Sequence, residues 1–159
     1  MNKFFAILGL SLIASTAGAT SQESEPVVWK GTTYYPLSGP GMPWNSSPNT
    51  PRRLFDEDST SNYKGYHATW EVKDGVLYLT SFEAKEHGKK VGLSQIFPGK
   101  TPPIKAEWFS NSIDLPQGGP IGRDSDDRPV YARELLLHFT KGKLVKTEEK
   151  AADSSRTVR

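Results

Sequence analysis

Short runs of alternating hydrophobic and polar residues recur along the chain, and they predict β-strands separated by turns. The clearest pattern covers 66–80, where two such runs flank Asp74-Gly75. Both positions of a tight hairpin turn need a positive φ, so this dipeptide predicts a two-residue β-hairpin. The register then predicts three facing pairs on an apolar face and three on a mixed face: Val72–Leu77, Trp70–Leu79 and Ala68–Ser81, then Glu71–Tyr78, Thr69–Thr80 and His67–Phe82.

Further runs rich in β-branched and aromatic residues extend this prediction to about seven short strands. Leucine content alone also fits a helix at 131–139, but Pro129 before it and a Lys141-Gly142 turn after it favour a strand. The sequence therefore predicts an all-β, single-domain fold, either an antiparallel sandwich or a partly open barrel. The other expected strands of this fold are 27–35, 91–97, 104–108 and 144–145. A bulge or tight turn is expected near Ser110-Asn111, after 104–108, and this run is expected to end at Gln117–Pro120.

The domain prediction places one β domain at 20–145. A long loop rich in proline, glycine and serine is expected within it at 36–62, because closely spaced prolines remove backbone donors and fix φ. Residues 122–129 are expected to form a second polar loop. The segment 146–159 is charged and lacks periodicity, so we expect a flexible polar tail there.

The first nineteen residues have the form of a secretory signal peptide. Lys3 precedes a short apolar run at Phe4–Ala14, and Ala17-Gly18-Ala19 has the small-x-small form of a cleavage site. That run of about 11 residues is well below the roughly 20 that cross a bilayer as a helix. We therefore expect cleavage between Ala19 and Thr20 and a periplasmic or secreted bacterial protein without a membrane-spanning segment.

Composition removes several classes of function. The chain has no cysteine, so disulfides, thiolate metal sites and cysteine nucleophiles are excluded. An exported domain of this kind must be stabilised by packing and hydrogen bonds. The formal net charge is +2, which gives no strong field for nucleic acid, so we expect no nucleic-acid partner.

Motifs that carry catalytic or metal chemistry are incomplete. The histidines His67, His87 and His138 lie on separate segments without metal-ligand spacing, and the acidic run from Asp124 lacks the glycine and the last acid of a calcium loop. The segment 92–96 begins like a nucleophile elbow but lacks the second glycine, so no serine stands out. We therefore expect no metal, no cofactor and no catalytic residue.

A non-catalytic binding module is the function that this sequence favours: an inhibitor, an immunity-type protein or an envelope accessory protein. Its partner is expected to be a protein or another envelope component, in an oligomeric state that the sequence leaves open. The alternative is a small cell-wall or glycan hydrolase that uses Glu71 and Glu107 as paired carboxylates. The candidate binding residues lie in the long loop and on the mixed face of the hairpin: Trp44, Arg52, Arg53, His67, Glu71 and Tyr78.

Six segments carry a likeness to a known group that covers roughly Tyr66 to Leu144: 65–72, 77–79, 97–99, 106–110, 115–118 and 131–135. With these residues the chain resembles a small bacterial family of β-rich hypothetical proteins, exported or soluble. That family has no assigned activity or catalytic residues to transfer. The resemblance implies a single self-contained domain.

Overall fold

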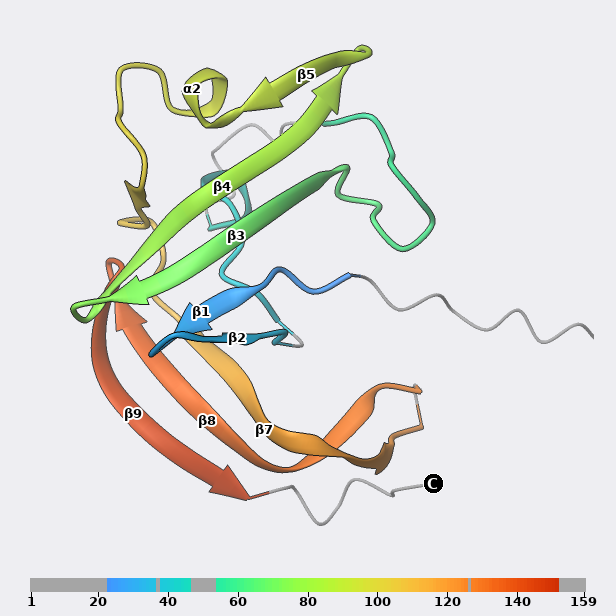
Figure 1. The fold of residues 1–159 in the computed structure, drawn as a ribbon, viewed down its shortest axis with the longest axis vertical. Helices are drawn as coiled ribbons and strands as arrows, with labels where there is room; N and C mark the ends of the chain where they lie inside the picture. The colour runs from blue at the N-terminus through green and yellow to red at the C-terminus, as the bar shows by residue number, and fades with distance from the viewer. Residues whose placement is uncertain (1–22, 37, 47–53, 126, 152–159) are drawn as a thin grey trace, which may run out of the picture.

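The computed structural model describes residues 23–36, 38–46, 54–125 and 127–151, and most of them lie in β-strands (Figure 1). The all-β prediction is confirmed. The described residues form nine strands and two helices of four residues each: β1 (Val27–Trp29), β2 (Thr32–Tyr34), α1 (Pro43–Ser46), β3 (Tyr66–Lys73), β4 (Val76–Glu86), β5 (Lys89–Gly92), α2 (Leu93–Ile96), β6 (Ile104–Lys105), β7 (Ser112–Arg123), β8 (Pro129–Thr140) and β9 (Lys143–Ala151).

All nine strands belong to one open sheet. Along the sheet the order is β2-β1-β3-β4-β9-β8-β7, while β5 and β6 also pair with β4. Neighbours are antiparallel except β1 and β3, which run parallel. The sheet is therefore mixed, and it stays open instead of closing into a barrel.

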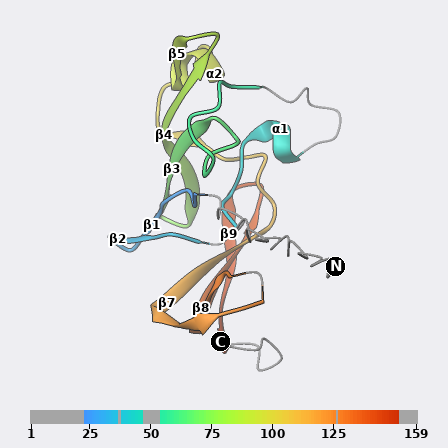
Figure 2. The same cartoon turned by 90° about the vertical axis from the view of Figure 1, so that its right-hand side faces the viewer.

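The sheet bends into two parts at the contact between β4 and β9. Val76 faces Lys143 there, and the two hairpin turns touch, because Leu77 N donates to Gly142 O and Leu144 N donates to Gly75 O, each at 2.8 Å. Figure 2 shows β3, β4 and β5 above β7, β8 and β9. One apolar core draws its buried side chains from both parts: among others Val27, Trp70, Leu77, Leu79, Ile104, Ile113, Leu115, Leu137 and Phe139.

The predicted first strand at 27–35 is wrong in one respect, because it is a hairpin of β1 and β2. Lys30 and Gly31 form the turn with φ angles of 50° and 80°. Two consecutive positive φ values match the tight hairpin turn, and glycine adopts them without strain. The lysine at the other position gave no turn signal in the sequence.

The predicted hairpin at 66–80 is confirmed near its turn and shifted beyond it. Val72–Leu77, Glu71–Tyr78 and Trp70–Leu79 face each other as expected. Thr80 is then an extra residue, and its hydroxyl donates to the Thr69 carbonyl oxygen at 3.0 Å. After this β-bulge the facing pairs are Thr69–Ser81, Ala68–Phe82 and His67–Glu83, which corrects the expected partners by one residue.

Three other boundaries differ from the prediction. The run at 91–97 ends β5 and continues as the helical turn α2, and the run at 104–108 leaves the sheet after Lys105. β7 does not stop at 117–120 but passes through that segment to Arg123 with two irregular steps in its pairing, so the polar loop is shorter than 122–129. β7 tolerates Pro116 and Pro120 because it is an edge strand that pairs with β8 alone.

β9 corrects the expected start of the polar tail. It continues beyond 145 to Ala151, paired with β8 along its length. Its side chains are mostly exposed, so the sequence shows no apolar period there, and the strand is held by backbone pairing instead. The rest of the expected tail, 152–159, and the expected signal peptide lie outside the described residues.

Candidate functional site

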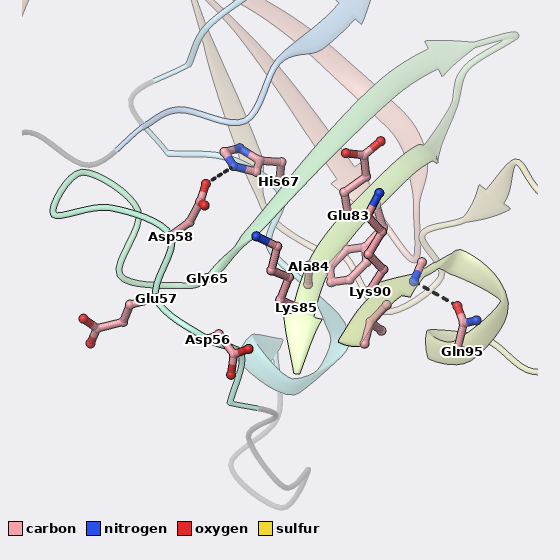
Figure 3. Close-up of a pocket in the computed structure, with 13 residues that line it drawn as sticks. Asp56, Glu57, Asp58, Gly65, His67, Glu83, Ala84, Lys85, Lys90 and Gln95 are labelled. Atoms are coloured by element: carbon pink, nitrogen blue, oxygen red, sulfur yellow. Dashed lines mark hydrogen bonds and ion pairs between the residues drawn. The ribbon is translucent and has the colours of Figure 1, made fainter. Parts of the chain in front are cut away.

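A hollow of about 680 Å³ opens beside the ends of β3 and β4 (Figure 3). Its walls come from three places in the chain: the acidic loop at 56–58, the β3–β4 hairpin, and β5 with the start of α2. Most of the side chains that line it are ionisable, and both signs of charge occur. The ionisable lining residues are Asp56, Glu57, Asp58, His67, Glu83, Lys85 and Lys90.

The Thr80 bulge decides which residues of β4 face this hollow. Leu77 and Leu79 point to the core, and an unbroken alternation would send Glu83 and Lys85 to the core as well. The extra residue reverses the alternation, so that Phe82 is buried while Glu83 pairs with His67 on the outer face. A local irregularity of one strand thus assembles the charged wall of the site.

The acidic loop is anchored through Asp56. Its backbone N–H donates to the Lys85 carbonyl at 2.8 Å, and its carboxylate accepts the backbone N–H groups of Gly88 at 2.7 Å and His87 at 3.0 Å. The Gly88 hydrogen bond is the main reason that the pKa of Asp56 is lowered, with the His87 backbone and the His87 and Lys85 charges adding to it. Asp56 therefore joins the loop to the β4–β5 turn.

Gly65 allows the same loop to lie close to the start of β3. Its φ is +69°, and a Cβ built on it would lie 2.5 Å from the Asp56 carbonyl oxygen and 2.9 Å from Phe55 Cβ. Both the backbone conformation and the close approach require glycine here. Gly65 thus sets the position of the loop relative to the hairpin.

His67 joins the loop to the hairpin from the other side. Its Nε2 lies 2.9 Å from Asp58 Oδ2, and its Nδ1 lies 3.8 Å from Glu23 Oε2. The hydrogen bond from His67 lowers the pKa of the Asp58 carboxyl. About half of each side chain is exposed, so this pair orients the imidazole more than it stabilises the fold.

The remaining lining residues give the hollow fixed charges of both signs. Glu57 points away from the strands in Figure 3, whereas Glu83, Lys85 and Lys90 come from the paired strands β4 and β5. Gln95 is held by hydrogen bonds that its Oε1 accepts from Gly92 N and Ser94 Oγ, at 2.9 and 3.1 Å. No hydroxyl group lines the hollow among the described residues, so its chemistry is acid–base and electrostatic.

The predicted binding residues do not form one surface. His67 lines the hollow, but Glu71 and Tyr78 face each other near the other end of the hairpin, about 13 Å further along β3 at 3.3 Å per residue. Trp44 lies in α1 and packs against other aromatic rings, with its ring centroid 5.9 Å from that of Phe55 and 6.2 Å from that of Tyr66. Arg52 and Arg53 lie outside the described residues.

The two carboxylates of the hydrolase alternative are held apart by the sheet. Glu71 faces Tyr78, which in turn faces Lys105 on β6, and Lys105 Nζ lies 3.2 Å from Glu107 Oε1. Strand β4 therefore lies between Glu71 and the segment that carries Glu107, and Glu107 pairs with Lys105. Among the described residues, no group of three or more His, Asp or Glu side chains is arranged to hold a metal ion.

Sequence reasoning missed most of the site. The acidic run at 56–58 lies in the predicted loop at 36–62, and no local pattern in the sequence places it beside Lys85 and Lys90. The hairpin pattern placed His67 correctly on the mixed face, but it paired His67 with Phe82 instead of Glu83. The bulge that makes this difference leaves no mark in the hydrophobic pattern before Phe82.

Comparisons with known proteins return no family model, no curated protein and no solved structure that matches this chain significantly. The resemblance to a bacterial family therefore stays a prediction. Of the two helices in the part of the chain that is described, neither is long and apolar enough to cross a membrane. The site is thus interpreted from its own geometry.

Proposed function

We propose that this protein is an exported binding module and that its ligand surface is the charged hollow, which binds without catalysis. The observation that carries the proposal is the presence of both signs of charge around one opening, which Lys85 and Lys90 line together with Asp58 and Glu83. Strands β3, β4 and β5 and the Asp56 anchor hold these groups in place, which lowers the entropy cost of binding.

The chemistry of the lining supports binding in preference to catalysis. A serine hydrolase needs a hydroxyl nucleophile beside its base, and no hydroxyl group lines the hollow among the described residues. His67 Nε2 lies 2.9 Å from Asp58 Oδ2, so this pair is part of the framework that shapes the hollow. Fixed charges of both signs instead suit a partner that carries both signs, such as a segment of another protein or envelope component.

Export follows from the apolar run and the small-x-small site at the start of the chain. An exported inhibitor, immunity-type protein or envelope accessory protein meets its partner outside the cytoplasm. A domain without cysteine that relies on its core fits this role, since it needs no oxidative folding machinery.

Reversal of the hollow's positive charges tests the proposal. Tagged full-length protein is expressed in a bacterial host, recovered from the periplasmic fraction and incubated with envelope extract at physiological salt. The wild type should retain a stoichiometric partner, and the double variant Lys85→Glu with Lys90→Glu should lose it.

The matched control is Lys143→Glu with Lys150→Glu, which changes the net charge equally on exposed positions of β9. This control should retain the partner. Recovery of no partner by the wild type would overturn the proposal, and so would equal loss from both double variants or undiminished capture by the hollow variant.

A further inference from the structure

Three side chains from the adjacent strands β7, β8 and β9 form a row on the outer face of the lower part of the sheet. Ser112 faces His138 in the register, and its Oγ lies 2.6 Å from His138 Nδ1. On the other side of the imidazole, Nε2 lies 3.5 Å from Glu148 Oε2. The neighbouring residues Ile113 and Leu137 are buried in the core, which fixes the backbone under the row.

The surroundings of the imidazole assign its proton. His138 Nε2 is shielded from solvent and has no hydrogen-bond partner in good geometry, and the nearby Glu148 carboxylate is the group that can stabilise a proton there. The neutral ring therefore places its proton on Nε2, and Nδ1 is left as the acceptor for the Ser112 hydroxyl. The contacts of the ring with Ser112 and Glu148 thus determine which nitrogen carries the proton.

Lys146 keeps the carboxylate of this row ionised. Its Nζ lies 2.5 Å from Glu148 Oε2. This hydrogen bond and the lysine charge lower the pKa of Glu148, and His138 adds a smaller effect. A hydroxyl, a base and an ionised group that orients the base are the parts of an activated nucleophile.

We propose that Ser112 is a nucleophilic serine that accepts acyl groups from small esters with good leaving groups, such as aryl esters. Ser112 Oγ forms a bond to the carbonyl carbon while its proton passes to His138 Nδ1. The bond from that carbon to the aryloxide breaks, and the aryloxide takes the proton. Water then adds to the acyl-serine with the same base, which releases the carboxylic acid and restores the hydroxyl.

This site lies on β7–β9, whereas the hollow lies on β3–β5, so the inference goes beyond the proposed binding function. Ser112 is partly exposed on the outer face of an edge strand, within reach of a small reagent. Three paired strands hold the row, so the groups are ordered before a reagent arrives.

A fluorophosphonate probe and p-nitrophenyl acetate test the proposal on the full-length protein, with the modified serine located by peptide mass spectrometry. Ser94 is the internal control, because it is a serine that hydrogen-bonds Gln95 and no histidine. Ser112 should react about 100-fold faster than Ser94, the lower end of what a positioned general base contributes. Equal labelling of Ser112 and Ser94 in the wild-type protein would by itself overturn the proposal.

The substitution His138→Asn separates a base from a structural partner. The asparagine amide can keep a hydrogen bond to Ser112 from about the place of Nδ1, but it takes no proton. Labelling of Ser112 should fall about 100-fold in this variant, while its melting temperature stays near that of the wild type. A labelling rate equal to that of the wild type would overturn the proposal.

Discussion

The indole Nε1 of Trp70 donates a hydrogen bond of 2.6 Å to Glu25 Oε2 inside the core. Trp70 is fully buried and Glu25 is 6% exposed. The second carboxylate oxygen, Oε1, accepts a hydrogen bond of 2.7 Å from Lys64 Nζ. One buried carboxylate thus joins the segment before β1 both to the centre of β3 and to the chain that leads into it.

Replacement of this carboxylate should therefore destabilise the whole domain. We expect Glu25→Ala to lower the free energy of unfolding by about 3 kcal/mol, because it leaves the Trp70 N–H unpaired in the core and Lys64 without its partner. Urea denaturation followed by tryptophan fluorescence measures the change.

The control substitution is Glu107→Ala. This side chain is 66% exposed and contacts Lys105 at the surface, so we expect a change within about 0.5 kcal/mol. Equal effects of the two substitutions would contradict the importance of the buried contact.

Gly65 offers a second test, on the loop that walls the hollow. Gly65→Ala adds a Cβ at 2.5 Å from the Asp56 carbonyl oxygen, in a residue whose φ is +69°. Gly75→Ala is the matched variant, since Gly75 has a φ of +73° and no atom within 4 Å of the added Cβ. We expect about 1 kcal/mol of destabilisation from the backbone at Gly75 and clearly more at Gly65, about 3 kcal/mol. Thermal and urea unfolding compare them, and equal losses would contradict the close approach.

The register after the bulge predicts the effect of Phe82→Ala. Phe82 is 3% exposed and faces Ala68 on the core side. Loss of its ring should cost about 3–5 kcal/mol, as for other buried aromatic residues. The adjacent Ser81→Ala should change stability by less than about 0.5 kcal/mol, because Ser81 is on the outer face. Without the bulge, Ser81 would face the core and Phe82 would face outward. A larger loss of stability from Ser81→Ala than from Phe82→Ala would therefore contradict the bulge.

The hairpin also shows how far sequence reasoning reaches in this protein. Alternation and the Asp74-Gly75 turn were enough to predict the class of fold and the pairs next to the turn, since both are local. The bulge at Thr80 depends on what packs below it: Phe82 is buried because it stacks on Tyr66 at 5.2 Å and lies against Phe55. Those contacts join segments that no local pattern connects.

The candidate sites were hard to predict for the same reason. Asp56 and Gly88 are 32 residues apart and meet where a loop bonds to the β4–β5 turn. Ser112 and His138 are 26 residues apart and meet through the pairing of β7 with β8. The pattern predicted the strand that carries His138, but the identity of its neighbours depends on register. β9 was missed because its mostly exposed side chains carry no apolar period, although β8 pairs with it throughout.

The proposed export makes a direct prediction about the N-terminus of the mature chain. If Ala17-Gly18-Ala19 is the cleavage site, N-terminal sequencing of protein from the periplasm or the medium should start at Thr20. An apolar run of this length is too short to cross a bilayer as a helix and is typical of a signal peptide. Protein that keeps Met1 and stays in the cytosolic fraction would contradict the assignment.

The anchor of the acidic loop predicts a specific dependence of stability on pH. The pKa of Asp56 is lowered from its ordinary value of 3.8, chiefly by the hydrogen bond from Gly88 N and then by His87 N and by the charges of His87 and Lys85. A carboxyl whose pKa is lower in the folded state contributes stability above its unfolded pKa, and this contribution is lost as the pH falls through the folded value. Asp56→Asn should therefore melt at a lower temperature than the wild type at neutral pH, because a neutral amide replaces the ionised carboxylate that accepts the two backbone hydrogen bonds.

The gap between the two melting temperatures should close as the pH falls below about 3.8. Other titrating groups are common to both proteins and cancel in this difference, so a gap that stays constant down to the lowest pH would contradict the role of the ionised carboxylate.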